Sequence, residues 1–211
     1  MQLDKLRREA SVVTLASSQP RMVQLPSHDI LYTAMLSPLG TLWIAAGPQG
    51  LVRVDSFVDE VAFCHAIERV GVGIPHFAPA QLDGITAQFE EYFAGRRTDF
   101  DLPIDLSRQT PFRRAVLEAV LSVPYGVVQS YQDIAFSVGK PAAVRAVAGV
   151  VATSPISLVI PCHRIIRSDG TAGEYAVRTL GSCGAHYKLM LLSLEGLTRI
   201  RHAPGWPPRG S

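Results

Sequence analysis

The first half of the chain alternates short apolar runs with turns that contain proline and glycine. Three apolar runs lie between residues 30 and 57, and turns at residues 37–40 and 47–50 separate them. Proline and glycine adopt the backbone angles that tight turns need, and short apolar runs between such turns are typical of antiparallel strands. We therefore predict a three-stranded antiparallel meander over residues 30–57.

Two segments after this meander have the character of helices. Residues 58–70 can form a helix. Residues 79–94 predict one because apolar side chains recur every three or four residues and Gly95 follows as a stop signal. The apolar positions of this second helix are Leu82, Ile85, Phe89 and Phe93. We expect both helices to accompany the sheet.

A pair of helices in the second half has the pattern of a helix-turn-helix. Ser130 is a helix cap, with Asp133 three residues later, and it begins a short helix. Gly139 turns the chain, and Pro141 opens a second helix that runs to Ala152. A short helix, a turn with glycine and a second helix together predict a helix-turn-helix.

The other apolar segments of the second half predict two more helices and a strand. Thr110 and Pro111 begin a helix that ends before residues 124–126. Residues 156–160 form a continuous apolar run, which we interpret as a buried strand, and residues 188–194 form the last helix.

These elements predict an α+β protein. We expect a small N-terminal antiparallel three-stranded sheet with helices, followed by a mainly helical C-terminal domain that contains the helix-turn-helix. The predicted divisions are an N-terminal arm (1–28), an α/β domain (29–95), a linker (96–106), a second domain (107–200) and a C-terminal tail (201–211).

Charge is distributed unevenly between the two halves. Residues 1–106 hold 13 acidic and 8 basic side chains, whereas residues 107–211 hold 5 acidic and 12 basic ones. A basic half suggests contact with a polyanion. The alternative is a chance difference between solvated faces.

Cysteine usage and hydropathy narrow the class further. Three cysteines argue against a disulfide framework and favour a reducing cytosol. No apolar run approaches the roughly 20 residues that a membrane span needs, and the N-terminus carries no clear signal peptide. The spacing of the histidines and cysteines matches no standard zinc pattern, so we expect no essential metal. We predict a cytoplasmic protein without a membrane partner.

The segment Pro161-Cys162-His163-Arg164 places a thiol, an imidazole and a guanidinium side by side. A neighbouring cation and a base lower the pKa of a thiol and make thiolate available for nucleophilic attack. A strand end at residue 160 would expose Cys162 at the mouth of a pocket. Because free cysteine is also a common core residue, the segment alone leaves two interpretations open, a nucleophile and a core side chain.

The second helix of the predicted pair combines small residues with one long cation, Arg145. Small side chains let a backbone approach another surface closely, and a single arginine can enter a DNA groove or fill a vacated place in the base stack. The alternative is a helix packed tightly in the core with Arg145 at its solvent edge. The small positions are Ala142, Ala143, Ala146, Ala148 and Gly149.

Taken together, these features resemble the O6-alkylguanine-DNA alkyltransferases, also called methylated-DNA–protein-cysteine methyltransferases. The similarity runs from about residue 110 to residue 196. The motifs that carry it are Thr110-Pro111-Phe112, Pro124-Tyr125-Gly126, Ser130-Tyr131, Arg145-Ala146-Val147, Pro161-Cys162-His163-Arg164, Ser168-Asp169-Gly170, Gly173, Tyr175 and Leu194-Glu195-Gly196.

The resemblance implies direct repair of O6-alkylguanine in DNA. Such proteins bind double-stranded DNA through the minor groove, rotate the damaged base out of the stack and transfer its alkyl group irreversibly to a cysteine. The resemblance implies no cofactor, and residues 107–200 would be the DNA-binding and alkyl-acceptor domain. We further expect a monomer, associated with the nucleoid if the host is bacterial.

The resemblance also implies a role for each matched side chain. Cys162 is the acceptor, and His163 is a base that acts through a water. Glu195 orients that imidazole, and Tyr131 donates its hydroxyl to guanine N3. The DNA-binding positions are Ser130, Ala143, Arg145 and Ala146, with Arg145 filling the gap in the duplex. The positions expected to line the substrate pocket are Ser154, Ile165, Tyr175 and Ala176.

Two departures from the family pattern keep alternatives open. Ser154 stands where the family has an asparagine that ties the recognition region to the nucleophile segment, and serine has fewer hydrogen-bonding groups. The loop over residues 176–187 is longer than in the family and lacks its glycine pair. A lesion sensor of the same fold that does not repair DNA is one alternative function, and a Cys–His hydrolase unrelated to DNA is another.

Overall fold

The first half forms a four-stranded sheet with one helix on each face. The computed structural model describes residues 29–71, 73–173 and 184–198. The predicted meander is confirmed: β1 (Asp29–Ser37), β2 (Gly40–Gly47) and β3 (Gly50–Ser56) pair in antiparallel order. A fourth strand, β4 (Ile74–Phe77), lies parallel to β1 at the sheet edge. Its four residues include a proline, which an edge strand tolerates. A strand of four residues is too short to be recognised from an alternating pattern of apolar and polar side chains.

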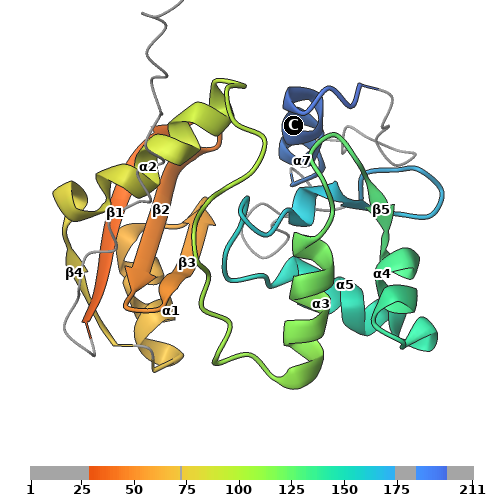
Figure 1. The fold of residues 1–211 in the computed structure, drawn as a ribbon, viewed down its shortest axis with the longest axis horizontal. Helices are drawn as coiled ribbons and strands as arrows, with labels where there is room; N and C mark the ends of the chain where they lie inside the picture. Colours follow the sequence, from red (N-terminus) through yellow and green to blue (C-terminus); the bar gives the residue numbers. More distant parts are fainter. Residues whose placement is uncertain (1–28, 72, 174–183, 199–211) are drawn as a thin grey trace, which may run out of the picture.

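Helices α1 (Glu60–Arg69) and α2 (Pro79–Phe93) confirm the two helices predicted for this half. The side chains of α1 pack with Ile30 and Tyr32 of β1 in a small core of their own. Those of α2 pack on the other face of the sheet, in a larger core that continues into the helical half. Figure 1 shows the sheet half and the helical half side by side, with the linker running between them.

The helical half contains the predicted helices. Thr110 caps α3 (Pro111–Leu121), and Ser130 caps α4 (Tyr131–Ser137). The capping box of α4 is complete, because the Ser130 hydroxyl accepts from the Asp133 amide at 3.1 Å and the Asp133 carboxylate accepts from the Ser130 amide at 2.8 Å. Asp133 therefore serves in place of the commoner glutamate.

The second helix of the pair begins as one 3-10 turn, Pro141–Ala143, and continues as α5 (Val144–Ala152). It packs against both α3 and α4, as expected for a helix-turn-helix. The last helix, α7 (Gly184–Leu194), begins four residues earlier than predicted. The α+β class predicted from the sequence is confirmed, and none of the described helices is long and apolar enough to cross a membrane.

The predicted strand at residues 156–160 is wrong. Ile156 makes a single bridge to Val54 of β3, and the amide of Ile160 then donates back to the Ile156 carbonyl at 3.0 Å. Leu158 supports this reversal with a positive φ of 71°. The segment is a buried turn, and it is apolar because it packs between the sheet and the helical half. A continuous apolar run indicates burial but does not distinguish a strand from a buried turn.

Strand β3 ties the linker and this turn to the sheet. The Leu51 amide donates to the Pro103 carbonyl at 2.8 Å, and the Val54 amide donates to the Pro155 carbonyl at 2.9 Å. Gly50 permits the first contact, because a Cβ there would lie 2.3 Å from the Pro103 carbonyl oxygen. The segment that leads to Cys162 is therefore anchored on the first half of the chain.

Candidate active site

Cys162 begins a one-turn 3-10 helix, Cys162–Arg164, directly after the buried turn. Its thiol is not exposed as a strand end would have made it, since only 4% of the residue is accessible. Burial raises the pKa of the thiol to about 11, although the nearby Ser154 hydroxyl and the charge of Lys188 act in the opposite direction. The group is therefore a protonated thiol at neutral pH.

His163 and Glu195 form a fully buried pair. The His163 Nε2 lies 2.8 Å from the Glu195 Oε1, and neither side chain is exposed. A carboxylate only accepts hydrogen bonds, so Nε2 carries the proton and Nδ1 keeps its lone pair. Nδ1 is buried and has no hydrogen-bond partner among the described residues. Burial lowers the pKa of His163, against the opposing effect of Glu195, so the imidazole is neutral with one nitrogen free to act as a base.

Glu195 is an ionised carboxylate whose two oxygens both accept hydrogen bonds from neighbouring donors. Arg164 donates from Nε and from a terminal nitrogen, both at 2.9 Å, and the Gly126 amide donates at 3.2 Å. Burial alone would raise the pKa of Glu195, but the hydrogen bonds from His163 and Arg164, together with the charge of Arg164, lower it to about 2. The sequence pattern indicates no separate role for Arg164, whereas the structure places it against Glu195 as the counter-ion of this carboxylate.

A short parallel strand pair brings Tyr131 to the same region. Strand β5 (Gln129–Ser130) pairs with β6 (Ile165–Ile166), so the start of α4 is joined to the residues that follow the Cys162 helix. Tyr131 is half-buried, and its ring lies 5.6 Å from the Lys188 ammonium.

Lys188 was not assigned a role in the site from the sequence. It is 1% exposed, and its ammonium donates to the Ile165 carbonyl. A lone lysine in the apolar run of the last helix was the available signal, because a lysine is almost never fully buried without a partner. Its charge favours the thiolate form of Cys162.

The remaining pocket positions are only partly described. Ile165 is fully buried beside the Cys162 helix. The Ser154 hydroxyl oxygen is buried close to the Cys162 thiol, but it has no hydrogen-bond partner of ordinary geometry among the described residues. Tyr175 and Ala176, the other predicted pocket residues, lie outside the described residues.

The predicted DNA-binding positions lie around the α4–α5 pair. Arg145 and Ala146 are exposed, and Ser130 and Ala143 are half-exposed. Arg145 makes no hydrogen bond or ion pair with any described residue, and it projects from a surface of small side chains. The alternative of a core helix with Arg145 at its solvent edge agrees with the valine side of α5, where Val147, Val150 and Val151 are buried. The small side chains next to Arg145 are on the exposed side of the same helix.

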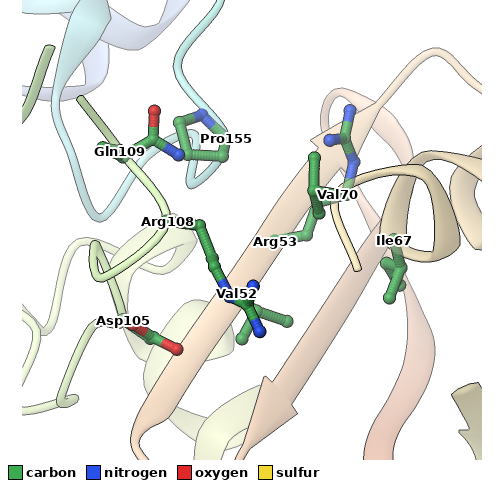
Figure 2. A pocket seen from close by; sticks show the side chains of 8 residues that line it. All are labelled: Val52, Arg53, Ile67, Val70, Asp105, Arg108, Gln109 and Pro155. Carbon is green, nitrogen blue, oxygen red and sulfur yellow. The ribbon is translucent and has the colours of Figure 1, made fainter. Parts of the chain in front are cut away.

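A cavity of about 360 Å³ lies between β3, the end of α1 and the linker (Figure 2). Arg53 enters it from β3, and Arg108 enters it from the linker side. The residues that line it are Val52, Arg53, Ile67, Val70, Asp105, Arg108, Gln109 and Pro155. None of the predicted site residues is among them, so this cavity is separate from the Cys162 site.

Cys64 and Cys162 are free thiols, and Cys183 lies outside the described residues. Within the described ranges, no three histidine, cysteine, aspartate or glutamate side chains lie together as a metal site would require. The chemistry available at the site is thus that of a thiol, a neutral imidazole, an ionised carboxylate and a buried ammonium.

Comparison with known proteins identifies the class to which this combination belongs. Residues 30–106 match the ribonuclease-like domain of 6-O-methylguanine DNA methyltransferase, and residues 111–197 match the DNA binding domain of the same protein. The two matches together cover both of the family-model domains of 6-O-methylguanine DNA methyltransferase.

Individual relatives agree with this result. The chain is 34% identical to a methylated-DNA–protein-cysteine methyltransferase of Methanosarcina barkeri, over 78% of this chain and 96% of the relative. It is 35% identical to the constitutive enzyme of Bacillus subtilis, over 79% of this chain and 96% of the relative. The crystal structure of Mycobacterium tuberculosis OGT in complex with DNA superposes with a TM-score of 0.66 at 32% identity, covering 82% of this chain and 96% of that one. The chain belongs to the 6-O-methylguanine DNA methyltransferase family.

Proposed function

We propose that this chain repairs O6-alkylguanine in DNA by moving the alkyl group permanently onto Cys162, as a single-turnover methylated-DNA–protein-cysteine methyltransferase. The observation that carries the proposal is the placement of Cys162 on the same helical turn as His163, whose imidazole pairs with Glu195. Thiol and imidazole share a one-turn helix, and Glu195 holds the imidazole at 2.8 Å with its other nitrogen free. The relatives named above bear the name of this activity.

The thiol has to lose its proton as it reacts. With a pKa of about 11, roughly one thiol in ten thousand is ionised at pH 7, so a base is required. His163 takes the proton on Nδ1 through a bridging water, and Glu195 stabilises the imidazolium that forms. Lys188 supports the thiolate as it develops.

The atoms and electrons of the displacement balance without a cofactor. The Cys162 sulfur bonds to the alkyl carbon while the bond from that carbon to guanine O6 breaks, and the electron pair remains on the base. Tyr131 donates a hydrogen bond to guanine N3, which offsets negative charge on the leaving guanine. The restored guanine stays in the DNA strand and takes up one proton, which equals the proton that the thiol gave to His163, so the step is balanced. Because the product is a stable thioether, each protein molecule acts once.

The partner in this proposal is double-stranded DNA, bound by a monomer through its minor groove. Ser130, Ala143 and Ala146 line the approach to the duplex, and their small size permits close contact with the groove. The extruded base is expected to lie against Ile165 and Ser154; Tyr175 and Ala176, the other predicted pocket residues, lie outside the described residues. A cytoplasmic location stays a prediction from the low cysteine count.

One experiment tests the function directly. The purified protein is mixed with a duplex oligonucleotide that contains one O6-methylguanine, and its intact mass is recorded beside a sample with the unmodified duplex. We expect the gain of one methyl group per molecule, only with the modified duplex, and located on the Cys162 peptide. Binding without a gain in mass would indicate a lesion sensor. Indifference to both duplexes, with turnover of an acyl ester, would indicate a hydrolase.

Arg145→Ala is expected to slow repair of duplex DNA by about tenfold or more, while reaction with free O6-methylguanine base is unchanged. The reason is that flipping a base costs a few kcal/mol, and the arginine in the vacated place recovers part of this cost. The free base needs no flipping. Rates of methyl transfer to Cys162 from the two substrates provide the measurement, and equal losses on both would contradict the role of Arg145.

A further inference from the structure

Tyr92 connects the first half of the chain to the candidate active site. It lies in the last turn of α2 (Figure 1), it is fully buried, and it belongs to the core that continues into the helical half. Its hydroxyl donates to the Glu195 Oε1 at 2.8 Å and lies 3.3 Å from the His163 Nε2. A side chain from the first half thus contacts both members of the His163–Glu195 pair.

Aromatic packing holds the Tyr92 ring in place. The rings of Phe93, Phe100 and Tyr125 surround it, with centroids 5.5, 5.2 and 6.4 Å away. A ring confined in this way presents its hydroxyl in one direction, and a buried tyrosine hydroxyl needs a polar partner. The packing therefore aims the hydroxyl at the carboxylate.

The hydroxyl changes what the carboxylate does to the imidazole. Oε1 accepts from His163, Arg164 and Tyr92. Each additional donor withdraws negative charge from this oxygen and weakens its pull on the Nε2 proton. With Tyr92 in place, Glu195 fixes the tautomer of His163 without drawing the imidazole into its charged form, in which it could not act as a base.

We propose that Tyr92 is a positioning residue for alkyl transfer, through which the first half of the chain sets the geometry and proton balance of the His163–Glu195 pair. The inference rests on the proposed function. Among residues 29–71, 73–173 and 184–198, the other charged or titratable groups around the pair are Arg164 on the same 3-10 helix, Lys188 on α7, Cys162, and Tyr125 after α3.

The test compares Tyr92→Phe with a matched control, Tyr32→Phe. Tyr32 is a buried tyrosine of the same half, and its hydroxyl donates to the Glu60 carboxylate at 2.5 Å, within a core that contains none of the site residues. The rate of methyl transfer from an O6-methylguanine duplex is measured across pH for both variants and the wild type. Stoichiometry is followed by intact mass.

We expect Tyr92→Phe to react about tenfold more slowly at neutral pH, the effect of one buried hydrogen bond to a charged group. Without the Tyr92 donor, Glu195 attracts the imidazole proton more strongly, so protonation of His163 begins at higher pH. The acid limb of the pH–rate profile therefore moves to higher pH. Tyr32→Phe keeps the rate and the profile of the wild type.

A second variant tests the inference even if Tyr92→Phe folds poorly. Replacing Tyr92 by 3-fluorotyrosine preserves the shape of the ring and makes its hydroxyl a stronger donor, so the acid limb is expected to move to lower pH. An unchanged profile in both variants would overturn the inference while leaving the proposed function intact. A wild type that accepts no methyl group would instead overturn the proposed function.

Discussion

Cys162→Ala is expected to abolish methyl transfer completely, so that the protein shows no gain in mass with the O6-methylguanine duplex. Alanine offers no atom that can form the thioether. No described thiol can replace it, because Cys64 lies on α1, on the face of the sheet away from the candidate site. Binding of the duplex is expected to persist, since the α4–α5 surface is unchanged.

The matched control for this variant is Cys64→Ala. Cys64 is half-buried, and burial raises the pKa of its thiol as it does for Cys162. Cys64 packs on the other face of the sheet from the His163–Glu195 pair, so it lacks the base that activates Cys162. We expect Cys64→Ala to gain one methyl group at the wild-type rate. Two results would show that Cys162 is not the acceptor. One is a gain of a methyl group by Cys162→Ala, and the other is the failure of Cys64→Ala to gain one.

Glu195→Gln is expected to have the second largest effect, on stability as well as on repair. The amide removes the negative charge that Arg164 faces, and the buried guanidinium loses its counter-ion. Breaking a buried ion pair in this way costs about 3–5 kcal/mol. It also puts an N–H group where His163, Tyr92 and Arg164 donate. We expect methyl transfer to fall by at least about a hundredfold, as for loss of a working general base.

The pH dependence of this stability loss has a definite sign. The folded protein lowers the pKa of Glu195 to about 2 from an ordinary value of 4.5. The stabilisation from the ionised carboxylate is therefore fully present above pH 4.5 and disappears as the pH falls towards 2. Glutamine does not titrate, so the difference in free energy of unfolding between wild type and variant is expected to narrow over this interval. Denaturant unfolding at several pH values measures it.

Glu91→Gln is the matched control for the ion pair. Glu91 pairs with Arg97 at 2.7 Å, but its side chain is 41% exposed. Exposed pairs of this kind contribute about 0–1 kcal/mol, so we expect a small change in stability and no change in repair. A Glu195→Gln variant as stable and active as Glu91→Gln would contradict the role assigned to the buried carboxylate.

Adjacency along the chain made part of the site predictable. Cys162 and His163 are neighbours in the sequence, so their proximity in space needed no knowledge of the fold. Glu195 was placed with them by family resemblance, and the distance of 2.8 Å to His163 agrees with that placement. Tyr92 was missed because its partner lies 103 residues away.

The sequence by itself determined the elements whose signals are local. Turns at residues 37–40 and 47–50, the Thr110 cap and the Ser130–Asp133 capping box depend on residues a few positions apart, and each formed as predicted. Tertiary structure decided that residues 156–160 form a turn, because the same apolar residues could also form a strand.

Tertiary structure also decided the short strand β4, the burial of Lys188 and the contact of Tyr92 with Glu195. These features depend on packing between segments far apart in the chain, where the loss of water from buried surfaces outweighs local preference. Local preferences selected the helices and strands of this protein, and packing between its two halves selected which polar groups meet at Cys162.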